Sequence, residues 1–164
     1  MLIGGYALPA YGQIRATMDV DLAIAANYQD IARLQEQLRE RGYQLPAKSN
    51  SAAPLFIVVD VKSKFEVEIW TKPDGIIFDD ELLRRRVKVH PFNNAFEMFV
   101  IGPEDFIVNK LARKDKGVQD EQDVISVLKR QKGKLDYDYL AKRAQQTNVN
   151  EQLRLIMQMS GTRP

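Results

Sequence analysis

The sequence predicts an α/β (α+β) fold, in which a mixed β-sheet flanked by helices is followed by a helical C-terminal part. β-prone runs alternate with helical segments up to about residue 101, whereas only helical periodicity follows. The 164 residues are enough for one domain with a small helical appendage. We therefore expect an α/β core over residues 1–101 and a helical part over residues 102–164 that packs on it.

The first predicted elements surround a pair of glycines. The apolar run Met1-Leu2-Ile3 is shorter than the ~5 residues of a typical strand. We therefore expect the chain to begin inside its first strand, with an N-terminal element lost or the true start upstream. A short helix is predicted over residues 6–12, because Pro9 limits its length and Gly12 ends it.

The next segments continue the sheet. Residues 17–24 alternate apolar and polar side chains, which predicts a strand. Residues 28–41 carry apolar side chains at helical spacing, and Gly42 follows in the C-cap position. A short strand is expected over residues 43–45 and a polar loop over residues 48–54.

The rest of the chain predicts a hairpin, two further strands and a series of helices. β-prone runs at 55–61 and 65–71 flank a turn. Pro103 and the two acids after it begin a helix. The remaining helices are expected over residues 79–86, 103–113, 120–130, 136–145 and 150–159, and the remaining strands over 87–89 and 95–101.

The composition excludes several classes of protein. With 45% hydrophobic and 28% charged residues, the chain is of globular type, and its net charge of +2 neither requires nor excludes a nucleic-acid partner. It has no cysteine and one histidine, His90, so disulfide frameworks, thiolate metal sites and histidine-rich metal sites are excluded, which argues against zinc. No apolar run approaches the ~20 residues of a membrane helix. Since no signal peptide is present either, we expect a soluble, cytoplasmic protein without a membrane partner.

A glycine pair and two aspartates carry the main chemical signal. Gly4-Gly5 stands between a strand and a helix, and a turn without side chains lets backbone N–H groups approach a phosphate. Asp19 and Asp21 leave the same face of a strand, ~7 Å apart. Carboxylates beside such a turn can hold Mg²⁺ or Mn²⁺, which prefer oxygen ligands. Taken singly, each feature is also compatible with a plain turn or an exposed strand face.

A metal site of this kind needs a third carboxylate. Glu66 and Glu68 alternate with apolar residues and therefore leave the polar face of their strand, while Asp60 ends the strand before it. Any of the three can supply the ligand. At least two of them are expected only to solvate the outer face of the hairpin.

Gly4-Gly5-Tyr6-Ala7 is followed by Tyr11-Gly12, Arg15, Thr17 and Asp19-Val20-Asp21. This string resembles the signature of the DNA polymerase β-type nucleotidyltransferase superfamily. More narrowly, it resembles the minimal and AbiEii-like nucleotidyltransferases of prokaryotic toxin–antitoxin loci. Further along the chain, Val67-Glu68-Ile69 is similar to the strand that bears the third acid of the family. Residues 103–111 are similar to a helix that packs behind the site. Residues 120–124 are similar to an Asp-x-x-Asp pattern, for which the resemblance implies a structural role.

The resemblance implies a nucleotidyltransferase-type sheet and a Mg²⁺- or Mn²⁺-dependent enzyme. The reaction it implies transfers a nucleoside monophosphate from an NTP to a hydroxyl of RNA or protein, and pyrophosphate leaves. Asp19, Asp21 and Glu68 would be the catalytic and metal-binding acids, with Glu68 preferred to Glu66 and Asp60. Nucleotide binding would fall to Gly4, Gly5, Arg15, Thr17 and Lys110. The implied partners are a tRNA or protein acceptor and a cognate toxin or antitoxin chain.

Two residues depart from the family pattern. Gly5 stands where a serine is also found, so no hydroxyl is available there for a phosphate. Glu68 stands where aspartate is commoner, which moves the carboxylate outward by one methylene.

Several interpretations remain open. Arg15 pairs with Asp19 or Asp21, contacts phosphate, or is solvated, and Trp70 stacks on a base or packs against the C-terminal helices. Basic clusters guide a polyanion or are solvated helix ends; they lie at residues 84–88, 113–116 and 129–134. Two alternatives to an enzyme follow: an inactive module that binds NTP or a partner chain, and a basic RNA-binding adaptor.

Overall fold

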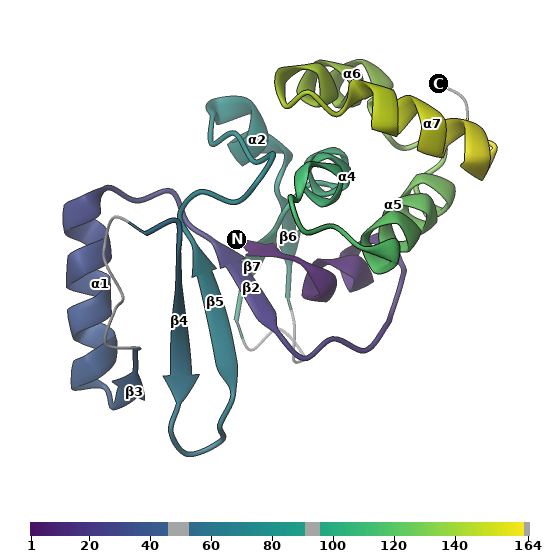
Figure 1. Cartoon of the computed structure of the whole chain (residues 1–164). Coiled ribbons are helices and arrows are strands. Elements are labelled where there is room, and N and C mark those ends of the chain that lie inside the picture. Colours follow the sequence, from purple (N-terminus) through teal and green to yellow (C-terminus); the bar gives the residue numbers. More distant parts are fainter. Residues whose placement is uncertain (46–52, 91–95, 163–164) are drawn as a thin grey trace.

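The computed structural model describes residues 1–45, 53–90 and 96–162, and within them seven strands form one mixed sheet of order β3-β4-β5-β2-β1-β7-β6 (Figure 1). The β1–β7 and β2–β5 pairs are parallel and the other pairs are antiparallel. The strands are β1 (Leu2–Ile3), β2 (Val20–Ala23), β3 (Tyr43–Gln44), β4 (Leu55–Asp60), β5 (Glu66–Trp70), β6 (Val87–Val89) and β7 (Met98–Val100).

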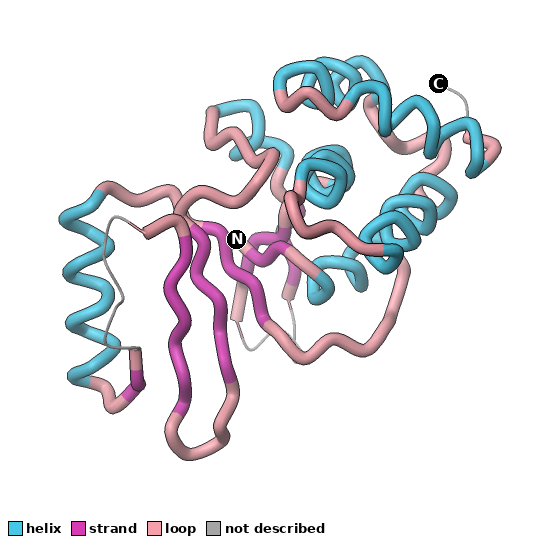
Figure 2. The backbone as a smooth tube through the Cα atoms, viewed as in Figure 1, coloured by secondary structure: helices cyan, strands magenta, loops and turns pink. Residues whose placement is uncertain are grey.

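The helices lie on two sides of the sheet. In the view of Figure 2, one helix stands apart on the left, and most of the others gather on the right. They are a 3₁₀ helix, η1 (Gly5–Tyr11), and the α-helices α1 (Tyr28–Glu40), α2 (Asp80–Arg85), α4 (Pro103–Ala112), α5 (Val118–Arg130), α6 (Tyr137–Gln146) and α7 (Asn150–Ser160). None of the described helices combines the length and apolarity that a membrane crossing requires.

Two apolar clusters hold these elements together. In the smaller cluster, α1 contributes Ile31 to Phe56, Val58 and Ile69 of β4 and β5. The larger cluster joins β1, β7 and η1 to the C-terminal helices α4–α7 and continues across residue 101. Tyr11 fixes η1 to this core because its hydroxyl donates to the carbonyl of Ile101. The C-terminal helices therefore share one core with the central strands.

Most predicted helices and strands are present, with shifted ends. Gly12 closes η1 in the left-handed conformation (φ 86°), as its position predicted. Helix α5 begins two residues before the predicted Asp120, because the Asp120 carboxylate accepts from the N–H of Gly117 and caps the extra turn. The predicted loop at residues 48–54 lies largely outside the described residues.

The strand predicted over residues 17–24 is shorter than expected, because β2 begins only at Val20. The segment before it is without regular structure, and alternate side chains in it turn inward. Arg15 and Thr17 are the inward ones, and they lie against Gly5. Met18, which the alternation predicts as a buried apolar side chain, is 85% exposed, so the pattern does not hold before Val20.

Candidate active site

The parallel pairing of β2 and β5 brings two of the predicted acids side by side. Asp21 stands opposite Glu68 in the register, so both side chains leave the same face of the sheet. The indole N–H of Trp70 lies between them, with Nε1 3.2 Å from Oδ1 of Asp21 and 3.1 Å from Oε2 of Glu68. Burial, and then the Asp21 carboxylate, raise the pKa of Glu68 above its ordinary value. The two carboxylates therefore form one interacting pair.

The glycine turn is shaped around this pair. Gly4 has a positive φ of 63°, and an added Cβ there would overlap Oδ2 of Asp21. A Cβ on Gly5 would lie 2.9 Å from Oγ1 of Thr17 and 3.0 Å from Nη2 of Arg15. Gly4 therefore requires glycine for its conformation and its space, whereas a side chain at Gly5 would require Thr17 and Arg15 to shift.

The other predicted acids are placed differently. Asp19 precedes β2 and is exposed, and its charge contributes to the raised pKa of Glu68. Glu66 begins β5 and is exposed. Asp60 accepts from the N–H of Lys62 and the hydroxyl of Ser63, so it stabilises the β4–β5 turn. Of the three candidates for the third ligand, Glu68 is the one beside Asp21.

The Asp21 and Glu68 carboxylates fit a divalent cation as two ligands, without a third acid beside them in the part of the chain that the structure describes. Among the described residues, no three Asp, Glu, His or Cys side chains are grouped so that they could hold a metal ion. Mg²⁺ is commonly bound by one or two protein carboxylates, and substrate phosphates complete its coordination. Asp21 and Glu68 meet that requirement, since they are close and partly buried and the N–H between them carries no charge. The structure thus differs from the expected group of three acids.

Two predicted phosphate-binding cations are engaged with acids behind the turn. Lys110 is only 3% exposed, and its Nζ lies 2.7 Å from Oδ1 of Asp120 and 3.2 Å from Oδ2 of Asp123. Arg15 donates from Nε and Nη2 to the two oxygens of Asp123, both at 2.9 Å. The suggested pairing of Arg15 with Asp19 or Asp21 is therefore wrong. The expected structural role of Asp120 and Asp123 agrees with these contacts, which tie α4 to α5.

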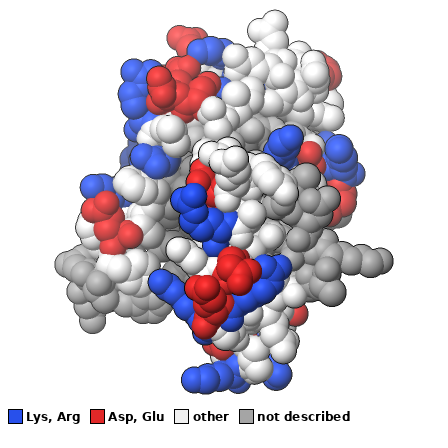
Figure 3. All heavy atoms as spheres, turned by 90° about the vertical axis from the view of Figure 1, so that its left-hand side faces the viewer, with Lys and Arg blue, Asp and Glu red and all other residues white. Residues whose placement is uncertain are grey.

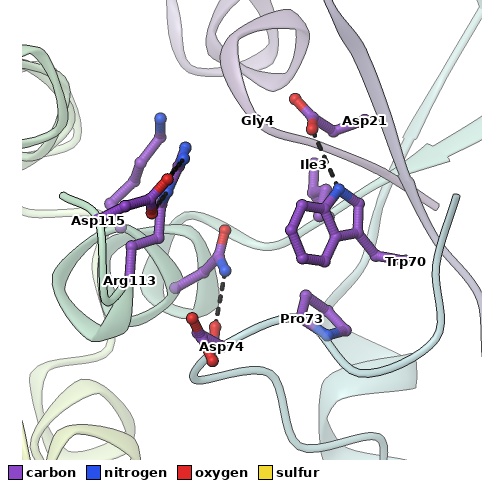
Figure 4. Close-up of a pocket in the computed structure, with 10 residues that line it drawn as sticks. Ile3, Gly4, Asp21, Trp70, Pro73, Asp74, Arg113 and Asp115 are labelled. Carbon is purple, nitrogen blue, oxygen red and sulfur yellow. Dashed lines mark hydrogen bonds and ion pairs between the residues drawn. The ribbon is translucent and has the colours of Figure 1, made fainter. Parts of the chain in front are cut away.

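A pocket lies beside Asp21 of the acid pair (Figure 4). One wall is the ring of Trp70 with Pro73 below it, and the facing wall is Arg113 with Asp115. Asn109 donates from its side-chain amide to the carbonyl of Asp74 at 2.7 Å, which fixes the floor loop. The residues that line the pocket are Ile3, Gly4, Asp21, Trp70, Pro73, Asp74, Asn109, Lys110, Arg113 and Asp115.

The sequence did not predict that Arg113 and Trp70 line this pocket. Arg113 donates from Nε and Nη2 to Asp115, at 3.1 and 3.0 Å. Its position in a basic cluster was a signal, but nothing local indicated that it faces Gly4 and Asp21. Trp70 packs against the main core, in line with one of its two interpretations, but its hydrogen bonds to Asp21 and Glu68 were not predicted. The signal available in the sequence was that Trp70 and Glu68 are two residues apart on one strand, so their side chains leave the same face.

The basic cluster at residues 84–88 is partly matched by acids. Arg85 lies 2.6 Å from Asp136, and Lys142 lies 2.7 Å from Glu81. On the face shown in Figure 3, Lys and Arg side chains stand beside Asp and Glu side chains. These contacts favour the interpretation of the arginine cluster as charged helix ends that are partly matched by neighbouring acids.

Comparisons with known proteins agree with this arrangement. A family model described as "Nucleotidyl transferase of unknown function (DUF2204)" matches residues 1–160. No curated protein matches the chain. Among solved structures, the chain is similar to an antigenic nucleotidyltransferase-like protein from Paracoccidioides brasiliensis, with a TM-score of 0.52 and 18% identity. That likeness covers 97% of this chain and 82% of the other, and at this identity it shows the fold alone.

Proposed function

Because the chain belongs to this family of nucleotidyl transferases, we propose that it transfers a nucleoside monophosphate from an NTP to a hydroxyl group, with Mg²⁺ or Mn²⁺ as cofactor. The observation that carries the proposal is the Asp21–Glu68 pair, whose Asp21 carboxylate lies against Gly4. Carboxylates next to a backbone turn without side chains suit a cation that carries a phosphate chain.

Each residue of the site then has a task. Asp21 and Glu68 would hold the cation, and the backbone of Gly4 and Gly5 would receive the phosphates. When bound, the cation supplies charge neutralisation to the triphosphate and to the leaving pyrophosphate. The resemblance also implies that the acid at Glu68 accepts the proton of the acceptor hydroxyl.

The proposed transfer forms one bond to the α-phosphorus and breaks another. The acceptor oxygen bonds to the α-phosphorus, and its proton would pass to the Glu68 carboxylate, the base that the sequence resemblance implies. The bond from the α-phosphorus to the bridging oxygen breaks, and pyrophosphate carries the electron pair away. Arg113, which lines the same pocket as Gly4, offers a two-pronged donor for the phosphate tail.

The acceptor and the setting are proposed from the sequence resemblance. A hydroxyl of RNA, such as a tRNA, or of a protein is the acceptor class that this resemblance implies. The same resemblance supports a place in a toxin–antitoxin pair, with a cognate chain as partner.

The direct test is transfer of label from each of the four α-labelled NTPs to protein and RNA acceptors in the presence of Mg²⁺ or Mn²⁺. We expect label transfer and pyrophosphate release, both lost in Asp21→Asn and in Glu68→Gln. Glu66→Gln is the matched control, because Glu66 lies on the same strand but is exposed at its start. No transfer with any NTP, or equal transfer by all variants, would contradict the proposal.

A second function, NTP or partner binding without transfer, is favoured by two observations. Lys110 is neutralised by two acids, and the described residues hold no group of three metal-binding side chains. A chain of this kind would bind an NTP with Mg²⁺ in a calorimetric titration and release no pyrophosphate. Transfer that depends on Asp21 would exclude it.

A further inference from the structure

Trp70 makes a contact that its place in the strand does not by itself require. Its single N–H lies within 3.2 Å of a carboxylate oxygen on each of two strands, Asp21 on β2 and Glu68 on β5. Period-two alternation puts Trp70 on the same face as Glu68, and the register places Ala23 opposite the tryptophan. The ring is held in place because it packs on the main core and lines the pocket with Ile3 and Pro73.

This contact determines how both acids are oriented. Oδ1 of Asp21 faces the indole, and Oδ2 occupies the space that a side chain on Gly4 would take. Oε2 of Glu68 faces the same N–H, which leaves Oε1 directed elsewhere. One donor thus selects which oxygen of each carboxylate remains for another ligand.

The chemistry of the donor suits a cation site. Two neighbouring carboxylates repel each other, and a donor between them reduces that repulsion. A lysine or arginine in this position would do the same, but its charge would also repel an incoming cation. An indole N–H donates without carrying charge and does not accept, so it draws the acids together and leaves their negative charge in place.

We propose that Trp70 is a positioning residue, which holds the Asp21 and Glu68 carboxylates together and oriented for a divalent cation. The inference rests on the proposed function, because it needs these two acids to be the ligands. Donors behind metal ligands typically change metal affinity by 10–100-fold when they are removed. We expect loss of the Trp70 N–H to be near the lower end, since only one donor is lost.

The test measures Mn²⁺ binding directly, from the electron paramagnetic resonance signal of free Mn²⁺. Trp70 is the only tryptophan of the chain, so 3-benzothienyl-alanine can replace tryptophan throughout and exchange the N–H for sulfur while keeping the ring. Substitution by 5-fluorotryptophan keeps the N–H and controls for incorporation. Trp70→Phe provides a genetic counterpart, and Ile69→Val trims the opposite face of the same strand without touching the acids.

We expect the benzothienyl protein and Trp70→Phe to bind Mn²⁺ about tenfold more weakly than wild type. The fluorotryptophan protein and Ile69→Val should bind it as wild type does, and thermal melting followed by circular dichroism shows that each protein is folded. Wild-type affinity without the N–H, or an equal loss in Ile69→Val, would overturn the positioning role and leave the proposed function standing. A wild-type chain that binds no Mn²⁺ would overturn the proposed cation site together with this inference.

Discussion

At Gly4, the Asp21 carboxylate occupies the space that any other residue would need for its side chain. The residue has φ 63° and ψ −156°, a conformation essentially confined to glycine, and Oδ2 of Asp21 lies where Cβ would be. The position of the Asp21 carboxylate therefore depends on the absence of a side chain at Gly4. This contact links the turn and the acid pair into one unit.

The first prediction concerns this contact. Gly4→Ala should lower the free energy of unfolding by at least the roughly 1–3 kcal/mol of backbone strain, and should also abolish nucleotidyl transfer by displacing Asp21. Gly12→Ala is a matched control, because Gly12 has φ 86° but its added Cβ would meet nothing within 4 Å. Urea unfolding and the label-transfer assay separate the two effects. Full activity in Gly4→Ala would contradict the geometry described for the turn.

The second prediction concerns Arg113 and its partner. The Asp115 side chain is 76% exposed and occupies the guanidinium fork that would receive a phosphate. Exposed pairs of this kind contribute only about 0–1 kcal/mol, so a triphosphate can displace Asp115. We expect Arg113→Gln to raise KM for the NTP about tenfold and Asp115→Asn to lower it by up to about fivefold. Wild-type KM values in both variants would remove Arg113 from the phosphate site.

At the scale of elements, α4 and α5 are joined by a buried group of charges rather than by apolar contacts alone. Asp123 is fully buried and accepts from Arg15, Lys110 and Gln119. It thereby connects the segment before β2 to both helices. This arrangement gives Lys110 a defined position at the edge of the pocket, with its charge already matched.

The third prediction is that Asp123→Ala destabilises the protein by roughly 3–5 kcal/mol, because Lys110 is left buried with one acid fewer and Arg15 loses its partner. Asp115→Asn is the control, since its exposed pair should change stability by less than about 1 kcal/mol. Urea unfolding of the three proteins measures the difference. A loss for Asp123→Ala no larger than that of the control would show that this group adds little to the fold.

A second charged group joins α4 to α6 and gives stability a pH dependence. Asp105 accepts from the hydroxyl of Tyr139 and lies 3.5 Å from Nε of Arg143, while Arg143 also pairs with Asp79. Burial raises the pKa of Asp105 to about 6, and Arg143 lowers the pKa of Asp79 to about 2.

The fourth prediction follows from the sign of these shifts. A raised folded-state pKa means that Asp105 stabilises the fold fully below about pH 4 and that this contribution is lost as pH rises through about 6. Asp79 acts in the opposite sense, and its contribution is lost as pH falls from about 4 towards 2. Between about pH 4.5 and pH 7, the Asp105 contribution should fall by about 2 kcal/mol.

Urea unfolding of wild type and Asp105→Asn at these two pH values tests this prediction. The Asn variant keeps the shape of the side chain but cannot titrate, so its stability should change less over the interval. Identical pH dependence in the two proteins would show that Asp105 does not titrate there.

At the scale of the whole molecule, the acid pair stands where the two clusters of the fold meet. Asp21 belongs to β2, whose neighbours pack in the main core, and Glu68 belongs to β5, whose opposite face packs on α1. The site therefore requires the correct parallel pairing of β2 with β5, which the chain reaches only after passing through α1, β3 and β4.

This dependence explains what the sequence could predict and what it could not. The superfamily and the mixed sheet are confirmed, because a dense motif over residues 3–24 and regular periodicities are local signals. The choice of Glu68 came from the resemblance and agrees with its position opposite Asp21. The partner of Arg15 was missed because Asp123 is 108 residues away, and no local pattern encodes such a contact.

The structure also shows why strand ends were misjudged. Alternation over residues 17–24 has the period of a strand, but Thr17 turns inward to meet the Cβ position of Gly5. The apolar residue of this part of the pattern, Met18, is exposed, so a period of two in the sequence does not by itself show that a segment pairs in a sheet. Asp19 was consequently expected inside the strand and lies before it.

The most direct test of the account is a crystal structure of the chain with Mn²⁺ and a non-hydrolysable NTP analogue, with anomalous scattering used to locate the metal. We predict a Mn²⁺ peak held by Asp21 and Glu68, with the phosphates lying over Gly4 and Gly5. A nucleotide bound elsewhere, or a metal that touches neither carboxylate, would contradict the central claim that this pair and this turn form the nucleotide site.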